Sequence, residues 1–441
     1  MIKKLLYIAL AIMGFISSCK KDSDPIFEDP DTRLSAELAK DQALLLSGTN
    51  GWKATLYPRG GRGFSYYFKF TAEGKVTMMS DFNGTAAMTS AESTYRLKAL
   101  QRPTLIFDTY NYVHLAADPD ASVSGGTSTA LGLSSDFEFA FTGTAGDTLK
   151  FEGTFYKNPM SMVKLSAAEE QGILAGGLKT MIDDNATYIS ANRNPYIPFA
   201  DGVKGAIAID PNVKTFKLNY VNNSGVSQTQ STTFAFGVNK IYLNKALVYG
   251  NLTINELSWD PAAKTYYIMS GATRINLLNS QNPITPLTLM FGFPSTFTYK
   301  KITIPASGLP AGVISKFNDV YSSMVGLFTT SGRTVTSTAL VLTGNTSLSV
   351  DINYFSNSTG QAFVASAAFT YNRIGDTFTL SSPVYNGNWT TRAIQIAPLQ
   401  AYLLSGPFKI DWVTTTNLNN TSTLGGFYRV ADPTSFFYGI M

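Results

Sequence analysis

Aromatic residues at every second position are the feature that most constrains the fold of this 441-residue chain. Phe64, Tyr66, Phe68 and Phe70 alternate with other residues. Because successive side chains of a β-strand point to opposite faces, this spacing places the four rings on one face of a strand. We therefore expect a strand here, then a turn at Glu73-Gly74 and a second strand that completes a hairpin.

The same alternation recurs along the chain. Further examples are Phe137, Phe139 and Phe141; Phe216, Leu218 and Tyr220; and Leu348, Val350, Ile352 and Tyr354. One-sided alternation is typical of antiparallel sheets with one packed and one solvated face. Aromatics make up 13% of the residues, which also favours strands. The sequence predicts a mainly β fold with a few helices (β-rich α+β), built as tandem antiparallel sheet modules that are barrel-like or sandwiches.

Three helices are expected between the strands. The first spans 33–46 and has leucines on one face. The second begins at Ser166, where Ser166-Ala167-Ala168-Glu169 forms a capping box. The third spans 311–325 and has the clearest helical periodicity in the chain.

Each helix precedes a strand-rich stretch, which suggests three related modules; three unrelated segments are the alternative. The predicted organisation is a lipoprotein signal peptide at 1–18, an acidic tether at 19–32, and β-rich modules at 33–165, 166–305 and 306–441.

Cys19 is the only cysteine, and it ends a short apolar leader. Lys3 and Lys4 precede the apolar stretch 5–16, and Ile16-Ser17-Ser18-Cys19 follows. This is the layout of a secretory leader, and it is shorter than the ~20 residues of a membrane-spanning helix. The last four residues resemble a bacterial lipobox, which predicts lipidation of Cys19 and an anchor in a membrane. A buried cysteine behind an uncleaved leader is the alternative.

The segment after Cys19 is charged and contains Pro25 and Pro30. Such a composition cannot bury enough apolar area to fold, so we interpret it as a spacer. Lys20-Lys21-Asp22-Ser23-Asp24 resembles the signal that directs Bacteroidota lipoproteins to the outer face of the outer membrane. We expect a cell-surface location there, and a periplasm-facing lipoprotein is the alternative.

Composition limits the possible partners. The formal net charge is +4, of which Lys3 and Lys4 in the leader contribute two, and charged residues make up only 15% of the chain. No basic cluster interleaves with aromatics, so nucleic-acid binding is not expected. With one cysteine the chain forms no internal disulfide, and its stability must come from packed cores.

The most suggestive chemistry surrounds His114, the only histidine. A zinc site of several imidazoles is therefore impossible, and the chain has no Gly-x-Ser-x-Gly elbow for a serine hydrolase. Tyr110, Tyr112 and His114 alternate, which predicts one strand face. With Asp118 and Asp136 around a Ser/Gly-rich loop, this face could bind a glycan, a peptide or a small molecule. The alternative is an ordinary sheet face with a hydrogen-bonded histidine.

Other candidate sites are weaker. Asp118, Asp120 and Asp136 lack the further ligands of a calcium loop, so no metal or other cofactor is expected. Glu138 and Glu152 lie between alternating phenylalanines, which favours solvated strand positions over a glycosidase pair. Asp147-Thr148-Leu149 resembles the O-glycosylation acceptor of exported Bacteroidota proteins, so Thr148 is a possible modification site.

The first module carries a distinctive set of short motifs. They are Arg33-Leu34, Gly51-Trp52, Tyr57-Pro58, Tyr67-Phe68-Lys69-Phe70, Gly74-Lys75-Val76, Ser93-Thr94-Tyr95-Arg96-Leu97, Phe107-Asp108-Thr109-Tyr110, His114-Leu115, Asp118-Pro119 and Ser135-Asp136-Phe137-Glu138-Phe139. This set resembles a Bacteroidota surface lipoprotein family of unknown function, whose members are typically encoded beside SusC/SusD-type importers and a zinc metallohydrolase lipoprotein. The resemblance implies a cell-surface accessory to nutrient uptake, with importer proteins as possible partners, and it supplies no catalytic residue.

We expect an outer-membrane lipoprotein that binds ligand or acts as a scaffold for such an importer. A structural or adhesive surface protein is the alternative. A surface hydrolase that uses only Asp and Glu is a third possibility, and no catalytic constellation supports it.

Overall fold

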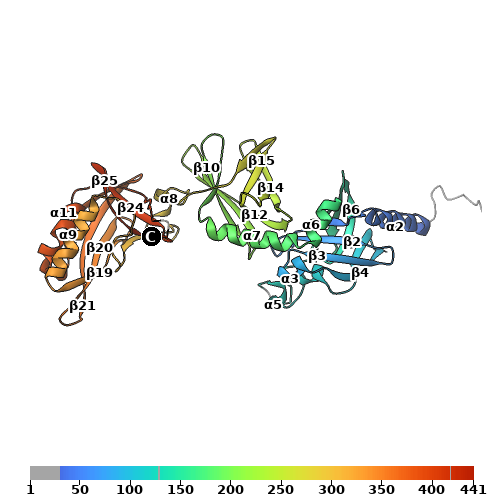
Figure 1. Ribbon diagram of the computed structural model, residues 1–441, viewed down its shortest axis with the longest axis horizontal. Coiled ribbons are helices and arrows are strands. Elements are labelled where there is room, and N and C mark those ends of the chain that lie inside the picture. Colours follow the sequence, from blue (N-terminus) through green and yellow to red (C-terminus); the bar gives the residue numbers. More distant parts are fainter. Residues whose placement is uncertain (1–29, 128–129, 418) are drawn as a thin grey trace, which may run out of the picture. The chain divides into compact units, whose positions relative to one another are not determined.

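The computed structural model describes residues 30–127, 130–417 and 419–441. Antiparallel strands dominate it and form two closed barrels and a nine-stranded sheet, with a small number of helices (Figure 1). This confirms the predicted β-rich fold class. The chain divides into two compact units, one ending at Lys179 and the other spanning Thr180–Met441. Cys19 lies outside the described residues.

The N-terminal barrel has eight strands in sequence order. It closes where β1 pairs with β8, with Trp52 opposite Lys164 and Leu56 opposite Met160. Closure leaves no unpaired strand edge. Its strands are β1 (Trp52–Leu56), β2 (Phe64–Phe70), β3 (Lys75–Ser80), β4 (Ala91–Ala99), β5 (Pro103–Phe107), β6 (Glu138–Ala145), β7 (Thr148–Gly153) and β8 (Pro159–Lys164).

Aromatic rings fill the interior of this barrel. Phe64, Tyr66, Phe68 and Phe70 all lie in its core, and Phe68 is fully buried. The predicted strand face and the β2–β3 hairpin are therefore confirmed. The core is packed with side chains, as in other small barrels.

Helix α2 (Pro30–Leu46) precedes the first strand. It begins three residues before the predicted start, and proline is favoured in the first turn of a helix. Only its C-terminal part packs on the barrel: Leu45 is buried in the core, whereas Leu34 is 41% exposed. The shorter helices of this unit are α3 (Gly84–Met88), α4 (Tyr112–Leu115), α5 (Ala121–Ser124) and α6 (Ala167–Leu174).

The capping box predicted at Ser166 is present. The Ser166 hydroxyl accepts the Glu169 amide, and the Glu169 carboxylate accepts the Ser166 amide. The helix stops at Ala175, because Gly176 takes a left-handed backbone conformation (φ 85°) that a continuing helix does not allow. The expected single helix is thus two, α6 and α7 (Gly177–Ala191), and Leu174 is half-exposed instead of part of an apolar stripe.

The middle sheet has the strand order β16-β15-β14-β13-β12-β11-β10-β9-β17, and all pairs are antiparallel. Met181 and Tyr188 of α7 join its core, and the Tyr266 hydroxyl donates to Asn185 at 2.7 Å. The strands are β9 (Pro195–Pro198), β10 (Lys204–Asp210), β11 (Thr215–Val221), β12 (Ser227–Gly237), β13 (Lys240–Tyr249), β14 (Leu252–Asp260), β15 (Thr265–Ser270), β16 (Thr273–Asn276) and β17 (Leu278–Asn279).

The C-terminal barrel also has eight strands in sequence order, closed by β18 against β25. Helices α9 and α11 pack against each other, and both contribute to the core. The elements are α8 (Leu287–Met290), β18 (Lys301–Ile304), α9 (Phe317–Thr330), β19 (Arg333–Leu342), β20 (Ser347–Ser356), β21 (Ala362–Ile374), β22 (Thr377–Tyr385), α10 (Gly387–Thr391), α11 (Ala393–Leu403), β23 (Phe408–Trp412), β24 (Leu424–Arg429) and β25 (Asp432–Ile440). Strand β18 lies before 306, where the sequence suggests that the third module begins.

The third predicted helix begins at Phe317, so the expected start at Ala311 is wrong. The preceding backbone is engaged elsewhere. The Lys316 amide donates to Thr434 of β25, and the Gly312 carbonyl accepts the Thr416 amide. The Ser315 hydroxyl, itself bonded to the Phe436 backbone, accepts the Phe317 amide at 3.1 Å and so ties the first residue of the helix to β25.

Candidate functional site

The region around His114 is helical, which corrects the expectation that Tyr110, Tyr112 and His114 alternate on a strand face. Tyr112 and His114 belong to the single-turn helix α4. Asn111 caps this turn: its side chain accepts the Tyr112 amide at 2.7 Å. The alternating spacing of aromatic residues favours a strand, but a strand here would need a neighbouring strand to accept its amides. The Asn111 side chain accepts an amide locally, which favours the helical turn.

Both ring nitrogens of His114 are occupied. Nδ1 accepts the Asn111 amide at 3.1 Å, and Nε2 lies 3.2 Å from the Phe107 carbonyl oxygen. A carbonyl can only accept, so Nε2 carries the proton and the ring is neutral. Burial lowers the pKa of His114, which keeps it neutral. The imidazole is therefore a positioning group and has no free nitrogen for metal binding or base catalysis.

His114 supports an exposed pair of rings. Tyr110 stacks on the imidazole with 5.6 Å between ring centroids, and Phe137 packs against it at 4.8 Å. Tyr110 is 58% exposed and Phe137 is 40% exposed. We call Tyr110, His114 and Phe137 the aromatic platform.

Asp118 fixes the outer edge of the aromatic platform. Its carboxylate accepts the Tyr110 hydroxyl and, through the other oxygen, the Asp120 amide. Partial burial and the bond to Asp118 together raise the pKa of Tyr110 to about 12. The tyrosine is thus a neutral donor at ordinary pH, and its ring stays largely exposed while it stacks on His114.

Asp136 does not join the aromatic platform, although it precedes Phe137. Its carboxylate is buried and accepts the amides of Phe155 and Tyr156 at 2.9 Å and of Asn158 at 3.2 Å. Three backbone donors satisfy this buried charge. Asp136 therefore holds the turn between β7 and β8 and is unavailable to a ligand.

The remaining predicted acidic residues also have local partners. Asp120 caps α5 by accepting the Ser122 amide. Glu152 lies 3.8 Å from the Lys157 ammonium, and Glu138 accepts the Thr154 hydroxyl at 3.4 Å. Within residues 30–127, 130–417 and 419–441, no group of three or more His, Cys, Asp or Glu side chains is arranged to hold a metal ion.

The predicted O-glycosylation site, Thr148, lies elsewhere on the N-terminal barrel. Thr148 is half-buried at the start of β7, directly after an exposed turn.

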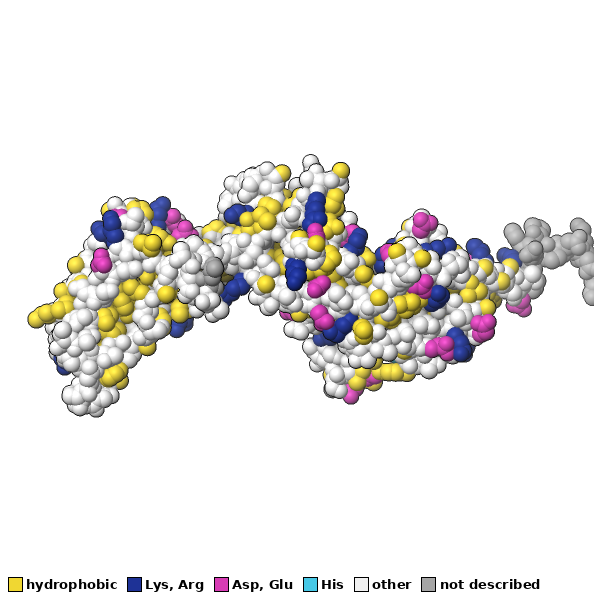
Figure 2. Space-filling model, viewed as in Figure 1, with side chains coloured by type: hydrophobic (Ala, Val, Ile, Leu, Met, Phe, Trp, Pro, Cys, Tyr) yellow, Lys and Arg dark blue, Asp and Glu magenta, His cyan; other side chains and the backbone are white. Residues whose placement is uncertain are grey.

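None of the helices in the described part of the chain is long and apolar enough to span a membrane. On the face seen in Figure 2, basic and acidic side chains are interspersed.

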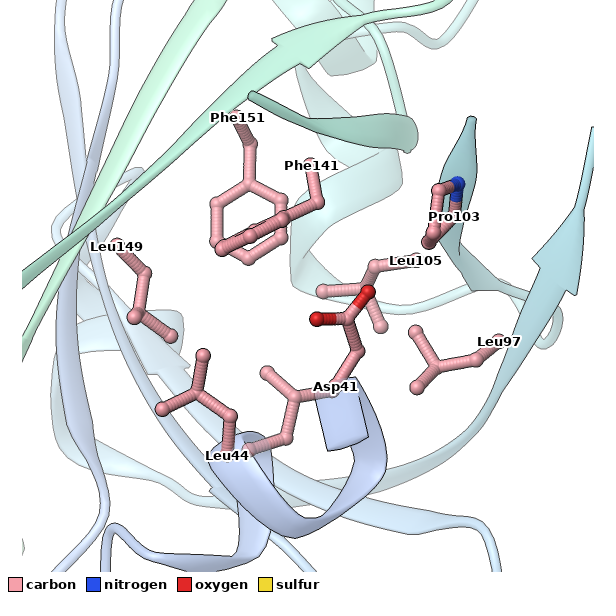
Figure 3. A pocket seen from close by; sticks show the side chains of 9 residues that line it. Asp41, Leu44, Leu97, Pro103, Leu105, Phe141, Leu149 and Phe151 are labelled. Atoms are coloured by element: carbon pink, nitrogen blue, oxygen red, sulfur yellow. The ribbon is translucent and has the colours of Figure 1, made fainter. Parts of the chain in front are cut away.

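A second feature, which sequence reasoning missed, is a pocket between α2 and the N-terminal barrel (Figure 3). Apolar side chains of β4 to β7 line it, and the Asp41 carboxylate points into it. Asp41 is only 4% exposed, and neither of its oxygens has a hydrogen-bond partner among the described residues. Burial, and secondarily the charge of Glu37, raise the pKa of Asp41.

The fold defines a class of proteins built from tandem antiparallel β-barrels and sheets. In this chain the exposed aromatic platform lies on the first barrel. This chain belongs to the family described as "Domain of unknown function (DUF4302)", whose model matches residues 23–261, more than half of its length. The match includes the whole N-terminal barrel and ends just after β14. No curated protein matches the chain.

Two solved structures are distantly similar. One is a protein of unknown function of the DUF3598 family from Nostoc punctiforme, at 8% identity and a TM-score of 0.14, covering 74% of this chain and 97% of that one. The other is transferrin binding protein B from Neisseria meningitidis, at 9% identity and a TM-score of 0.11, covering 76% and 72%. Neither similarity carries an argument about fold or function.

Proposed function

We propose that this chain is a lipid-anchored protein of the outer membrane, exposed at the cell surface, that binds ligand for a SusC/SusD-type nutrient importer. The lipobox-like Ile16-Ser17-Ser18-Cys19 and the charged segment after it support the anchor and its sidedness. The motifs of the first module support the importer context. Ligand capture or scaffolding at the surface is the role that these features have in common.

The aromatic platform is the observation that carries the ligand-binding part of the proposal. A single exposed apolar side chain needs no explanation, but here two exposed rings contact the same imidazole and are fixed by His114 and Asp118. Rigid aromatic faces bind with little loss of side-chain entropy. A sugar ring or an apolar peptide side chain matches such a surface, with the Tyr110 and Asp118 oxygens available to hydroxyl or amide groups.

Replacement of Cys19 by alanine tests the anchor. The variant Cys19→Ala is expected in the soluble fraction after cell lysis, whereas the native protein sediments with membranes. Retention of the variant in membranes would contradict lipidation. Capture of the surface-labelled native protein should also recover an importer, and recovery of none counts against the uptake role.

Replacement of Tyr110 by alanine tests the aromatic platform. We expect retardation by soluble polysaccharides in affinity electrophoresis, with affinity about tenfold lower in Tyr110→Ala, or ~1.4 kcal/mol. Phe155→Ala is the matched control, because Phe155 is 79% exposed on the same barrel but lies outside the aromatic platform. Equal losses in both variants, or no retardation of the native protein by any polysaccharide, would argue against a glycan site.

A further inference from the structure

A cleft crosses the outer face of β23 in the C-terminal barrel, and we call it the β23 cleft. Lys409 and Asp411 are exposed and alternate with the buried core residues Phe408 and Ile410, so their side chains point outward. Two adjoining cavities of about 430 and 580 Å³ lie here, both open to solvent, and Asp376, Ile410 and Asp411 line both of them. Each volume lies within the roughly 300–1,000 Å³ of typical ligand sites, so the cleft has room for a ligand with more than one ring.

Neighbouring elements form the walls of the β23 cleft. Residues 286–289, which include the start of α8, border the larger cavity, and Val430 and Pro433 border the smaller one. Arg373 holds α8 against the barrel, because its guanidinium donates to two backbone carbonyls of the segment 288–291, at 2.6 and 2.8 Å. The wall is therefore fixed, and the Arg373 guanidinium is occupied by carbonyl groups of the protein itself.

A fixed tyrosine forms the aromatic part of the β23 cleft. Tyr428 lines the smaller cavity, and its ring stacks on Phe436 with 4.3 Å between ring centroids. The Tyr428 hydroxyl donates to the Trp412 carbonyl at 2.9 Å. The ring lies beside Gly426, where an added Cβ would lie 3.0 Å from a ring carbon. Because the ring is held from two sides, a ligand that packs on it costs little side-chain entropy.

Charged side chains of both signs surround this ring. Asp376, Asp411, Lys409 and Arg429 all line the smaller cavity, and Asp376 and Lys409 lie 3.2 Å apart. Among the described residues, the Asp411 carboxylate accepts one hydrogen bond, from the amide of its neighbour Trp412 at 2.8 Å, so it can accept further donors. A charged ligand of either sign meets a group of its own sign here, whereas a neutral polar ligand meets both donors and acceptors.

We propose that the β23 cleft binds a neutral carbohydrate, with one pyranose ring against Tyr428 and its hydroxyl groups bonded to Asp411, Asp376 and Lys409. Each sugar hydroxyl both donates and accepts, so vicinal hydroxyls match a carboxylate and an ammonium that lie side by side. The C–H groups of the sugar ring supply the apolar surface that packs on an aromatic face. The larger cavity along α8 has room for further sugar units.

The inference goes beyond the proposed function, because the β23 cleft lies in the C-terminal barrel, outside the family match at residues 23–261. It needs neither the membrane anchor nor the aromatic platform. Failure of this site therefore leaves the results for Cys19→Ala and Tyr110→Ala unchanged, and their failure does not decide this site.

The experiment is an NMR titration of the full chain that carries Tyr110→Ala, which removes the exposed tyrosine of the aromatic platform. Methyl signals of Ile410 and Val430 report occupancy of the β23 cleft. The probes are the neutral disaccharides cellobiose, maltose, mannobiose and galactobiose. The monosaccharide unit of the best binder is then compared with its uronic acid and its amino sugar. We expect at least one disaccharide to shift both methyl signals, and both charged sugars to bind more weakly than the neutral monosaccharide.

Further substitutions in the same chain identify the groups that bind. Asp411→Ala removes an exposed acceptor without touching the core, and it should lower the disaccharide affinity about tenfold, as expected for a lost hydrogen bond to a charged group. Asp319→Ala is the matched control, because Asp319 is exposed on the same barrel but outside the β23 cleft, and it should leave the affinity unchanged. Tyr428→Ala should abolish binding, whereas Tyr428→Phe keeps the ring and should retain most of it.

Four outcomes overturn the proposal. They are no shift with any of the neutral disaccharides, tighter binding of either charged sugar, unchanged affinity in Asp411→Ala, and equal losses in Asp411→Ala and Asp319→Ala. Because Asp411 is exposed, its variant decides the result even if Tyr428→Ala does not fold.

Discussion

Single buried side chains decide much of the local structure of the N-terminal barrel. Asp136 is the clearest example, because one carboxylate holds three amides of the 155–158 turn. Removing it leaves these partly buried donors without their acceptor. Asp136→Ala should lower the free energy of unfolding by ~2–4 kcal/mol in urea denaturation of the full chain. The control Asp147→Ala, exposed in the neighbouring β6–β7 turn, should change it by less than ~0.5 kcal/mol. Equal effects would show that Asp136 does not carry the turn.

Asp41 should make stability depend on pH in the opposite sense to a paired carboxylate. Its folded-state pKa is raised, mainly by burial, so folding favours the protonated form. The contribution is fully present below the unfolded pKa, near ~3.9, and is lost as pH rises through the folded value. Asp41→Leu removes this term. The variant should therefore gain stability relative to the native protein as pH rises, by ~1–3 kcal/mol at pH 8. Thermal unfolding between pH 5 and 8 measures the stability of Asp41→Leu relative to the native protein. A relative stability of the variant that falls as pH rises would contradict the raised pKa of Asp41.

At the scale of the element, α9 contains a glycine that its own geometry does not require. Gly326 lies in the interior of the helix, and a Cβ added there would meet no other atom within 4 Å. Gly326→Ala should stabilise the C-terminal barrel by ~0.5–1 kcal/mol, because alanine loses less backbone entropy in a helix. Gly332 follows the same helix at φ 72°, so Gly332→Ala should destabilise the barrel instead. Chemical denaturation measures the change in unfolding free energy for both variants. If both variants were stabilised, or both destabilised, the assignment of Gly326 to the helix interior and Gly332 to its end would be contradicted.

Periodicity predicted the elements that are built from long, regular patterns. The β2 strand, its hairpin with β3 and the Ser166 cap are present as expected, because packing and local pattern agree there. The predicted start of α9 is wrong, because the backbone before Phe317 bonds to distant partners. The predicted strand at Tyr112 is wrong, because the Asn111 cap favours a helical turn over the alternating spacing. Helix α11 has Pro398 in its interior, and no helix was expected there.

The candidate sites show the same division. Tyr110, His114 and Asp118 are close in sequence, and the structure places them in contact. The sequence could not place the Asp136 carboxylate, because its amide partners lie about 20 residues further along the chain. The pocket at Asp41 had a usable signal. Asp41 falls seven residues after Leu34 and four before Leu45, so it occupies the apolar face of its helix. A charged residue at such a position marks either an error in the pattern or a functional group.

For the whole molecule, three separate cores are the main determinant of stability. Each closed barrel has its own buried cluster, and the nine-stranded sheet has a third. The core of the N-terminal barrel draws only on residues between Leu45 and Met162. Every strand of that barrel is paired on both sides within it. Those are the properties of a domain that can fold alone.

A fragment spanning residues 30–179 should therefore fold independently. It keeps barrel closure, α2 and the contacts of α6, in which Glu170 accepts Tyr67 and Lys69 at 2.7 Å. Its urea midpoint should match one of at least two transitions in the full chain, since separate cores unfold separately. A fragment that ends at Glu152 lacks β8, leaves the edges of β1 and β7 unpaired, and should aggregate. Near-UV circular dichroism and sedimentation distinguish these outcomes. A disordered 30–179 fragment, or one cooperative transition in the full chain, would mean that the barrels depend on one another for stability.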